Sequence, residues 1–221
     1  MISIKNLYIS FTKEYNALNN VNLEIEDKEK VALVGEKESG KTTLLRVLAK
    51  LEDIGRGEVY INGKNLNKID FKTDINVGYV PQSPVFKQNK TVLENLEYVL
   101  KIRNYDMPSV NYKILSALNN FDIDSIRNFK INQLSKYQKY LVQLARVSMR
   151  KIDLFLIDDI FSDLTLSEQE NMINYVNMLI ENNLDATFIF ALENEKIASK
   201  LKLKVIKINN GCITSKAKSN F

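Results

Sequence analysis

One short loop constrains the fold of this chain more than any other feature. Residues 35–43 read GEKESGKTT and stand between the apolar run at 31–34 and the apolar stretch that begins at Leu44. The pattern G-x-x-x-x-G-K-[ST] is matched by Gly35, Gly40, Lys41 and Thr42. Glycine permits a tight loop whose backbone N–H groups point at phosphates, and the start of the following helix adds its positive end. The loop therefore predicts a strand–loop–helix unit that binds a nucleotide.

The residue types in the loop suggest separate roles. The side chain of Lys41 is expected to bridge the β and γ phosphates, and the hydroxyl of Thr42 to ligate Mg²⁺. The nucleotide-binding residues are expected to be Gly35, Glu36, Lys37, Glu38, Ser39, Gly40, Lys41, Thr42 and Thr43. The alternative is a chance match in a lysine-rich chain, which the scarcity of glycine, 7 in all, and the correct flanks disfavour.

A second acidic element follows another apolar run. Residues 154–157 are apolar and lead into Asp158 and Asp159. Carboxylates at the C-terminal end of a buried strand lie where parallel sheets bind their ligands. We expect Asp158 to serve the metal and Asp159 to be the catalytic base that orients the attacking water. As an alternative, the Asp pair simply ends a strand and begins a turn.

The hydrophobic periodicity predicts an α/β fold. Strands are expected at 2–11, 21–25, 31–34, 59–61, 77–80, 154–157, 187–192 and 205–208, and helices at 41–51, 91–103, 109–120, 135–150, 166–183 and 194–201. This order favours a mostly parallel core with an antiparallel edge. Residues 83–150 contain helical patterns only and are expected to be an inserted helical subdomain. Asn209, Asn210 and Gly211 predict a hairpin near the C-terminal end.

Composition excludes several classes of protein. The chain has 221 residues, no His and only Cys212, which excludes internal disulfides, Cys/His metal sites and Ser-His or Cys-His catalysis. A net charge of +4 is too small to predict a nucleic-acid partner. The apolar runs are far shorter than the roughly 20 residues that cross a bilayer. Since residues 1–5 show no export signal, a cytoplasmic protein is expected, with any membrane role depending on a partner.

With these residues in place, the chain resembles the nucleotide-binding subunit of ATP-binding cassette (ABC) transporters over nearly all of its length. The segment GYVPQ, ending at Gln82, resembles the Q-loop, whose Gln touches Mg²⁺ or the water. The segment TVLENL at 91–96 is similar to the one that follows the Q-loop in importers. Ser135 and Gln138 stand where the family signature L-S-G-G-Q belongs. By its distance from Lys41 in the sequence, Phe11 corresponds to the aromatic residue that stacks on adenine in that family. The alternative for Phe11 is a buried residue at a strand end.

The resemblance implies a single domain over 1–221. Its P-loop NTPase (RecA-like) core is expected at 1–82 and 151–221, with an antiparallel β-subdomain and the helical insertion at about 83–150. The implied ligands are ATP and Mg²⁺. The implied partners are a membrane-spanning subunit and a second nucleotide-binding subunit facing this one head to tail. Such a protein is cytoplasmic and peripherally associated with the inner face of the cell membrane.

The sequence departs from the family at positions that serve hydrolysis. Lys136 and Tyr137 replace the signature glycines, and their side chains are expected to obstruct the approach to the partner's nucleotide, although the charge of Lys136 could add attraction. Asp159 stands where the family has Glu, and Glu193 stands at the switch-His position. A carboxylate facing the γ-phosphate repels it, although Glu193 turned to solvent is the plainer alternative. We therefore expect binding to survive better than turnover.

The residues are compatible with two main functions. The first is the ATP-binding subunit of an ABC transporter, which couples ATP binding and slow hydrolysis to movement of a separate membrane protein. The uneven damage favours a heterodimer, with a homodimer as the alternative, and the segment at 91–96 favours import. The second is a hydrolysis-deficient regulatory subunit that reports nucleotide state to a membrane or cell-envelope complex. A DNA-repair or chromosome ATPase of the same superfamily is a weaker third choice, because no coiled-coil heptads are present.

Overall fold

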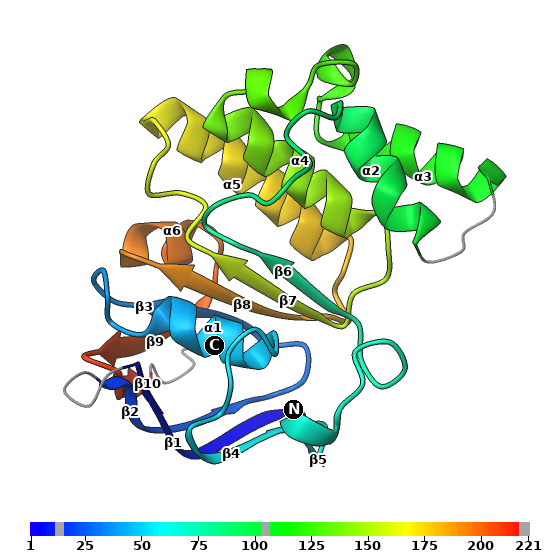
Figure 1. Cartoon of the computed structure of the whole chain (residues 1–221). Helices are drawn as coiled ribbons and strands as arrows, with labels where there is room; N and C mark the ends of the chain where they lie inside the picture. Colours follow the sequence, from blue (N-terminus) through cyan, green and yellow to red (C-terminus); the bar gives the residue numbers. More distant parts are fainter. Residues whose placement is uncertain (12–15, 103–106, 217–221) are drawn as a thin grey trace.

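A six-stranded sheet forms the centre of the molecule (Figure 1). The computed structural model describes residues 1–11, 16–102 and 107–216. The strand order is β10-β9-β3-β8-β7-β6, in which every neighbouring pair is parallel except the edge pair β9 and β10. The strands are β3 (Lys30–Val34), β6 (Val77–Val80), β7 (Leu154–Asp158), β8 (Thr187–Leu192), β9 (Lys204–Asn209) and β10 (Cys212–Lys216). The parallel core with an antiparallel edge is therefore confirmed.

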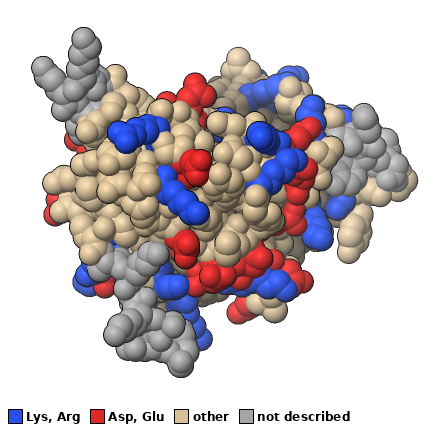
Figure 2. Space-filling model, turned by 90° about the horizontal axis from the view of Figure 1, so that it is seen from below, with Lys and Arg blue, Asp and Glu red and all other residues tan. Residues whose placement is uncertain are grey.

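A second, antiparallel sheet lies below the first in Figure 1. Its order is β2-β1-β4-β5, and its strands are β1 (Ile2–Ser10), β2 (Asn16–Ile25), β4 (Arg56–Ile61) and β5 (Lys64–Asn65). Helix α1 (Lys41–Leu48) lies between the two sheets, and its apolar side chains belong to the same buried cluster as residues of both. Figure 2 views the molecule from this side and shows acidic and basic side chains interspersed over the surface.

Helices cover the other face of the large sheet. Between β6 and β7 the chain forms α2 (Val92–Lys101), α3 (Met107–Asn120) and α4 (Lys136–Ser148), together with the short 3₁₀ turns Asp124–Ile126 and Ile131–Gln133. Helix α5 (Leu166–Glu181) packs beside α4, and α6 (Glu195–Lys200) follows β8. Strands β7 and β8 are buried along their whole length, which explains why they read as continuous apolar runs.

Several predicted boundaries are wrong. Strand β1 ends at Ser10, one residue before Phe11. Strand β2 begins at Asn16 rather than at Val21, because residues 16–20, three of which are Asn, extend the pairing with the end of β1. Helix α1 stops at Leu48 instead of at residue 51, since the backbone of Lys50 takes φ 54°.

Capping residues explain the starts of three helices. Thr91, Ser135 and Asn194 are N-caps that precede their helices rather than members of them. Helices α4 and α5 stop at Ser148 and Glu181, two residues earlier than predicted, and α3 begins two residues earlier, at Met107. Residue 103, the predicted end of α2, lies outside the described residues. The hairpin at Asn210 and Gly211 is confirmed, because both have positive φ, 46° and 73°, between the antiparallel strands β9 and β10.

Candidate functional site

The loop at 35–43 connects β3 to α1 at the C-terminal edge of the parallel strands. A methyl group added at Gly35 would lie 2.2 Å from the carbonyl oxygen of Ile208, and one at Gly40 would lie 2.5 Å from that of Ala17. Gly40 also has φ 102°, a conformation that residues with side chains rarely adopt. The two glycines of the sequence pattern therefore allow the loop to pass close against β9 and β2.

The side chain of Lys41 folds back over the loop. Its Nζ donates hydrogen bonds to the carbonyl oxygens of Gly35 at 2.7 Å and Glu36 at 2.6 Å, and to Oγ of Ser39 at 3.1 Å. Burial lowers the pKa of Lys41, while the carboxylates of Asp159, Glu193 and Asp158 act in the opposite direction. An ammonium group held in a ring of loop oxygens can exchange these partners for phosphate oxygens.

Thr42 and Asp158 meet at the end of β7. The hydroxyl of Thr42 donates to Oδ1 of Asp158 at 2.9 Å, and the hydroxyl of Tyr79 donates to Oδ2 at 3.2 Å. Asp158 is only 1% exposed, and this burial raises the pKa of its carboxyl group. The described residues contain no group of three or more His, Cys, Asp or Glu side chains suited to a metal. A hydroxyl beside one carboxylate nevertheless fits Mg²⁺, which is usually bound by one or two carboxylates together with water and phosphate oxygens.

Asp159 is held at both carboxylate oxygens. Nε2 of Gln82 donates to Oδ2 at 3.1 Å, and the hydroxyl of Ser162 donates to Oδ1. The backbone N–H of Asp159 donates to the carbonyl of Ala191 on β8, and its φ is 39°. Asp tolerates this left-handed region better than most residues. Asp158 is the last residue of β7 and Asp159 follows it, as expected both for a site and for a plain strand end.

Ser135 and Gln138 form a capping box at the start of α4. Oγ of Ser135 accepts from the N–H of Gln138 at 3.1 Å, and Oε1 of Gln138 accepts from the N–H of Ser135 at 3.0 Å. Lys136 forms an ion pair with Asp163, in the loop after β7, and Tyr137 packs partly buried against the hydrophobic cluster. Ser135 and Gln138 therefore cap α4, and Lys136 and Tyr137 connect its first turn to neighbouring parts of the fold. These contacts are separate from the loop at 35–43.

The structure distinguishes between the alternatives for Glu193 and for Phe11. Oε1 of Glu193 lies 3.9 Å from Nζ of Lys37, so the carboxylate faces the loop at 35–43 instead of turning away from it. Phe11 is 55% exposed, which excludes the alternative of a buried strand-end residue. The residues that follow it, 12–15, lie outside the described part of the chain.

Three hydroxyl groups of the site have no role predicted from the sequence. Tyr79 contacts Asp158, Ser162 contacts Asp159, and Tyr140 donates to the carbonyl oxygen of Gln82 at 2.6 Å. Tyr79 lies within the GYVPQ segment that ends at Gln82, and Ser162 stands three residues after Asp159. This closeness in sequence is the only signal for them. Tyr140 gives no such signal, because its contact spans 58 positions.

Comparison with known proteins identifies a family for this chain. Residues 18–162 match the family described as ABC transporter. The chain is 30% identical over 213 residues to the sn-glycerol-3-phosphate import ATP-binding protein UgpC of Bartonella quintana (strain Toulouse), covering 96% of this chain and 61% of that protein. It is 28% identical over 200 residues to the sulfate/thiosulfate import ATP-binding protein CysA of Synechocystis sp., covering 90% and 56%. The chain thus spans about three fifths of the length of these curated relatives.

Solved structures show the same fold. The dimeric structure of MJ0796, a bacterial ABC transporter cassette, matches with a TM-score of 0.87 and 26% identity, and each chain is covered completely. A dimeric post-hydrolysis state of the same cassette, bound to ADP and Pi, matches with a TM-score of 0.86 and 25% identity. Among residues 1–11, 16–102 and 107–216, no helix has the length and apolarity needed to cross a membrane.

Proposed function

Because the chain belongs to the ATP-binding family of ABC transporters, we propose that it is the ATP-binding subunit of an import system. In this role it couples ATP binding and slow hydrolysis to a conformational change in a separate membrane subunit. Domains of this family bind ATP, and the relatives compared above are named as import ATP-binding proteins. The observation that carries the proposal is the hydrogen bond between Thr42 and Asp158, beside the ammonium group of Lys41.

Residues of the loop and of neighbouring strands have different roles in binding ATP. Lys41 exchanges its bonds to the carbonyls of Gly35 and Glu36 for bonds to phosphate oxygens. Thr42 and Asp158 would hold Mg²⁺, which would neutralise charge on the phosphates. Phe11 offers an exposed ring for stacking on the adenine base. Lys41, Thr42 and Asp158 already lie together at the loop.

Hydrolysis depends on Asp159 and Gln82. The carboxylate of Asp159 orients the attacking water and accepts its proton, and Gln82 holds that carboxylate. Asp is one methylene shorter than the Glu usual at this position, and a displacement of about 1 Å costs roughly a hundredfold in rate where geometry is tight. Glu193 adds negative charge on the side of the loop where the γ-phosphate binds. Turnover is therefore slow while binding is retained.

A second nucleotide-binding subunit is part of the proposal. The solved cassettes with the same fold are dimeric, and Ser135 with Gln138 are the residues we assign to the partner's nucleotide. Lys136 and Tyr137 crowd that helix start, so two copies of this chain would carry the same defects in both sites. We therefore favour a heterodimer, bound to the membrane subunit at the cytoplasmic face of the membrane.

A hydrolysis-deficient regulatory subunit is the second candidate. The observation that favours it is the ion pair between Glu193 and Lys37, which keeps a carboxylate beside the phosphate loop. Such a protein closes on ATP, scarcely cleaves it, and reports nucleotide state to a membrane or cell-envelope complex. Both candidates share the same nucleotide site and differ only in turnover.

Binding of Mg·ATP and release of phosphate test the proposal together. The purified chain is expected to bind Mg·ATP, and Lys41→Ala is expected to abolish binding, while Lys64→Ala, on the distant strand β5, serves as a matched control. Steady phosphate release of about 1 s⁻¹, by the chain alone or with a copurified membrane subunit, favours the transport motor. Binding without release above background favours the regulatory subunit. Equal ATP affinities for the wild type and Lys41→Ala would reject both.

A further inference from the structure

The hydroxyl of Tyr140 connects α4 to the residues around Asp159. It donates to the carbonyl oxygen of Gln82 at 2.6 Å, and Nε2 of the same Gln82 donates to Oδ2 of Asp159 at 3.1 Å. We propose that Tyr140 is a positioning residue for the Gln82–Asp159 pair. This inference rests on the proposed function, in which Asp159 orients the attacking water.

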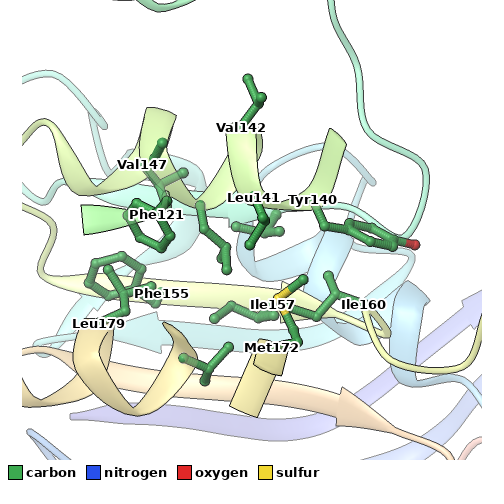
Figure 3. Packing of buried hydrophobic residues seen from close by; sticks show 14 of the residues in the cluster. Phe121, Tyr140, Leu141, Val142, Val147, Phe155, Ile157, Ile160, Met172 and Leu179 are labelled. Atoms are coloured by element: carbon green, nitrogen blue, oxygen red, sulfur yellow. The ribbon is translucent and has the colours of Figure 1, made fainter. Parts of the chain in front are cut away.

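The ring of Tyr140 is fixed by its surroundings. Its side chain is almost completely buried, and Figure 3 shows the ring at the edge of the hydrophobic cluster, beside Leu141 and Ile160, with its hydroxyl oxygen pointing outward. A buried ring has little freedom to rotate, so the position of the hydroxyl is set by core packing. Burial also raises the pKa of Tyr140, and the hydroxyl therefore remains a hydrogen-bond donor at physiological pH.

The segment after β6 is anchored to α4 at a second point. Nη1 of Arg146 donates to the carbonyl oxygen of Val85 at 2.8 Å, and its guanidinium group lies over the ring of Phe86. Arg146 lies six residues after Tyr140 on the same helix. Helix α4 thus fixes the main chain at 82 and at 85, and the side chain of Gln82 extends from this fixed backbone to Asp159.

A parallel connection joins the start of α4 to the other side of Asp159. The hydroxyl of Ser162 donates to Oδ1 of Asp159, and the next residue, Asp163, accepts a hydrogen bond from Lys136 in the first turn of α4. The ion pair is exposed at the surface, whereas the hydroxyl of Tyr140 extends from a buried ring and its bond to Gln82 is partly buried. Because exposed pairs contribute little, we take the bond of Tyr140 to Gln82 as the stronger of the two connections from α4 to the neighbours of Asp159.

Asp159 has little freedom to adjust its position if the neighbouring main chain moves. Its side chain has one methylene fewer than Glu, and its backbone takes the left-handed φ of 39°. Strained backbone persists at functional sites only where neighbouring groups hold it. If the main chain at Gln82 shifts, the amide that holds Oδ2 shifts with it, and the carboxylate loses its alignment with the water.

Removal of the hydroxyl alone tests the inference. Tyr140→Phe keeps the ring and its packing, and is expected to lower kcat for ATP hydrolysis about two- to tenfold, the usual effect of one hydrogen bond, with KM and Mg·ATP affinity unchanged. Tyr175→Phe is the matched control, because it removes a hydroxyl on α5 that donates to Asp122 at 2.7 Å rather than to Gln82. A loss of kcat equal in both variants would overturn the inference.

A double-mutant cycle separates positioning from general packing. If Tyr140 acts through Gln82, the effect of Tyr140→Phe on kcat disappears in a Gln82→Ala background, since the amide to be positioned is gone. If Tyr140 only stabilises the fold, the same loss of kcat appears in both backgrounds, and the inference is wrong.

The side-chain amide of Gln82 gives a readout that needs no turnover. Its NMR signals, assigned by their loss in Gln82→Ala, are expected to shift in Tyr140→Phe and to stay in place in Tyr175→Phe. Unshifted signals in Tyr140→Phe would refute the positioning role. Wild-type protein that binds Mg·ATP but releases no phosphate would end the hydrolytic part of the proposed function, and the amide signals would then decide the role of Tyr140 alone.

Discussion

Gly40→Ala is the substitution whose effect can be worked out most directly from the structure. Its φ of 102° makes any side chain unfavourable, at a cost of about 1–2 kcal/mol. The new Cβ would also lie 2.5 Å from the carbonyl oxygen of Ala17, and such overpacking costs about 1–3 kcal/mol. Taking about 3 kcal/mol in all, the melting temperature of a chain of this size falls by about 6–12 °C.

The relief of that clash also moves the phosphate loop. A loop N–H displaced from a phosphate oxygen loses a hydrogen bond to a charged group, which lowers ATP affinity by at least about tenfold. Thermal unfolding and titration with a fluorescent ATP analogue measure both effects. Gly63→Ala is the matched control, because Gly63 has φ 76° but no atom within 4 Å of an added Cβ. If Gly40→Ala unfolds at the same temperature as Gly63→Ala and binds ATP with the same affinity, the reasoning is wrong.

Three further predictions concern charged groups. Asp159→Asn is expected to lower phosphate release at least about tenfold with ATP affinity nearly unchanged, as single-turnover kinetics beside equilibrium titration would show; equal losses of both would be contrary evidence. Glu193→Gln is expected to raise ATP affinity about three- to tenfold, because a negative charge near Lys41 is removed, and unchanged affinity by calorimetry would contradict this. Glu94 has a pKa lowered to about 2, mainly by the hydrogen bond from Lys90, so the stability it adds is present above pH 4.5 and is lost as the pH falls toward 2. If NMR shows that the carboxyl carbon of Glu94 titrates near pH 4.5, the prediction of a lowered pKa is wrong.

The sequence predicted the parts of the fold that follow from local pattern. The glycine-containing loop, the buried strands and the hairpin at Asn210 and Gly211 depend on residues close together in the chain, and the structure has all of them. The start of β2 was missed because residues 16–20 contain Asn, which is uncommon in strands, and only pairing with β1 extends the strand there. The helix ends were missed where a capping residue, such as Ser135, precedes the first helical residue.

The site was less predictable than the fold. Asp158 and Asp159 could be assigned from their place after an apolar run. The contacts of Tyr140 with Gln82 and of Lys136 with Asp163 could not, because each joins elements far apart in sequence and depends on the direction of a side chain. Any attraction of Lys136 for a phosphate has a competitor on the same chain, the carboxylate of Asp163.

A single-turnover experiment with protein in excess over radiolabelled ATP tests the central claim most directly, since it reports binding and cleavage from one sample. ATP is expected to be retained in the presence of Mg²⁺, to be lost when EDTA is added, and to be converted to ADP no faster than about 1 s⁻¹. Retention that is the same with and without Mg²⁺, or no retention at all, would contradict the claim.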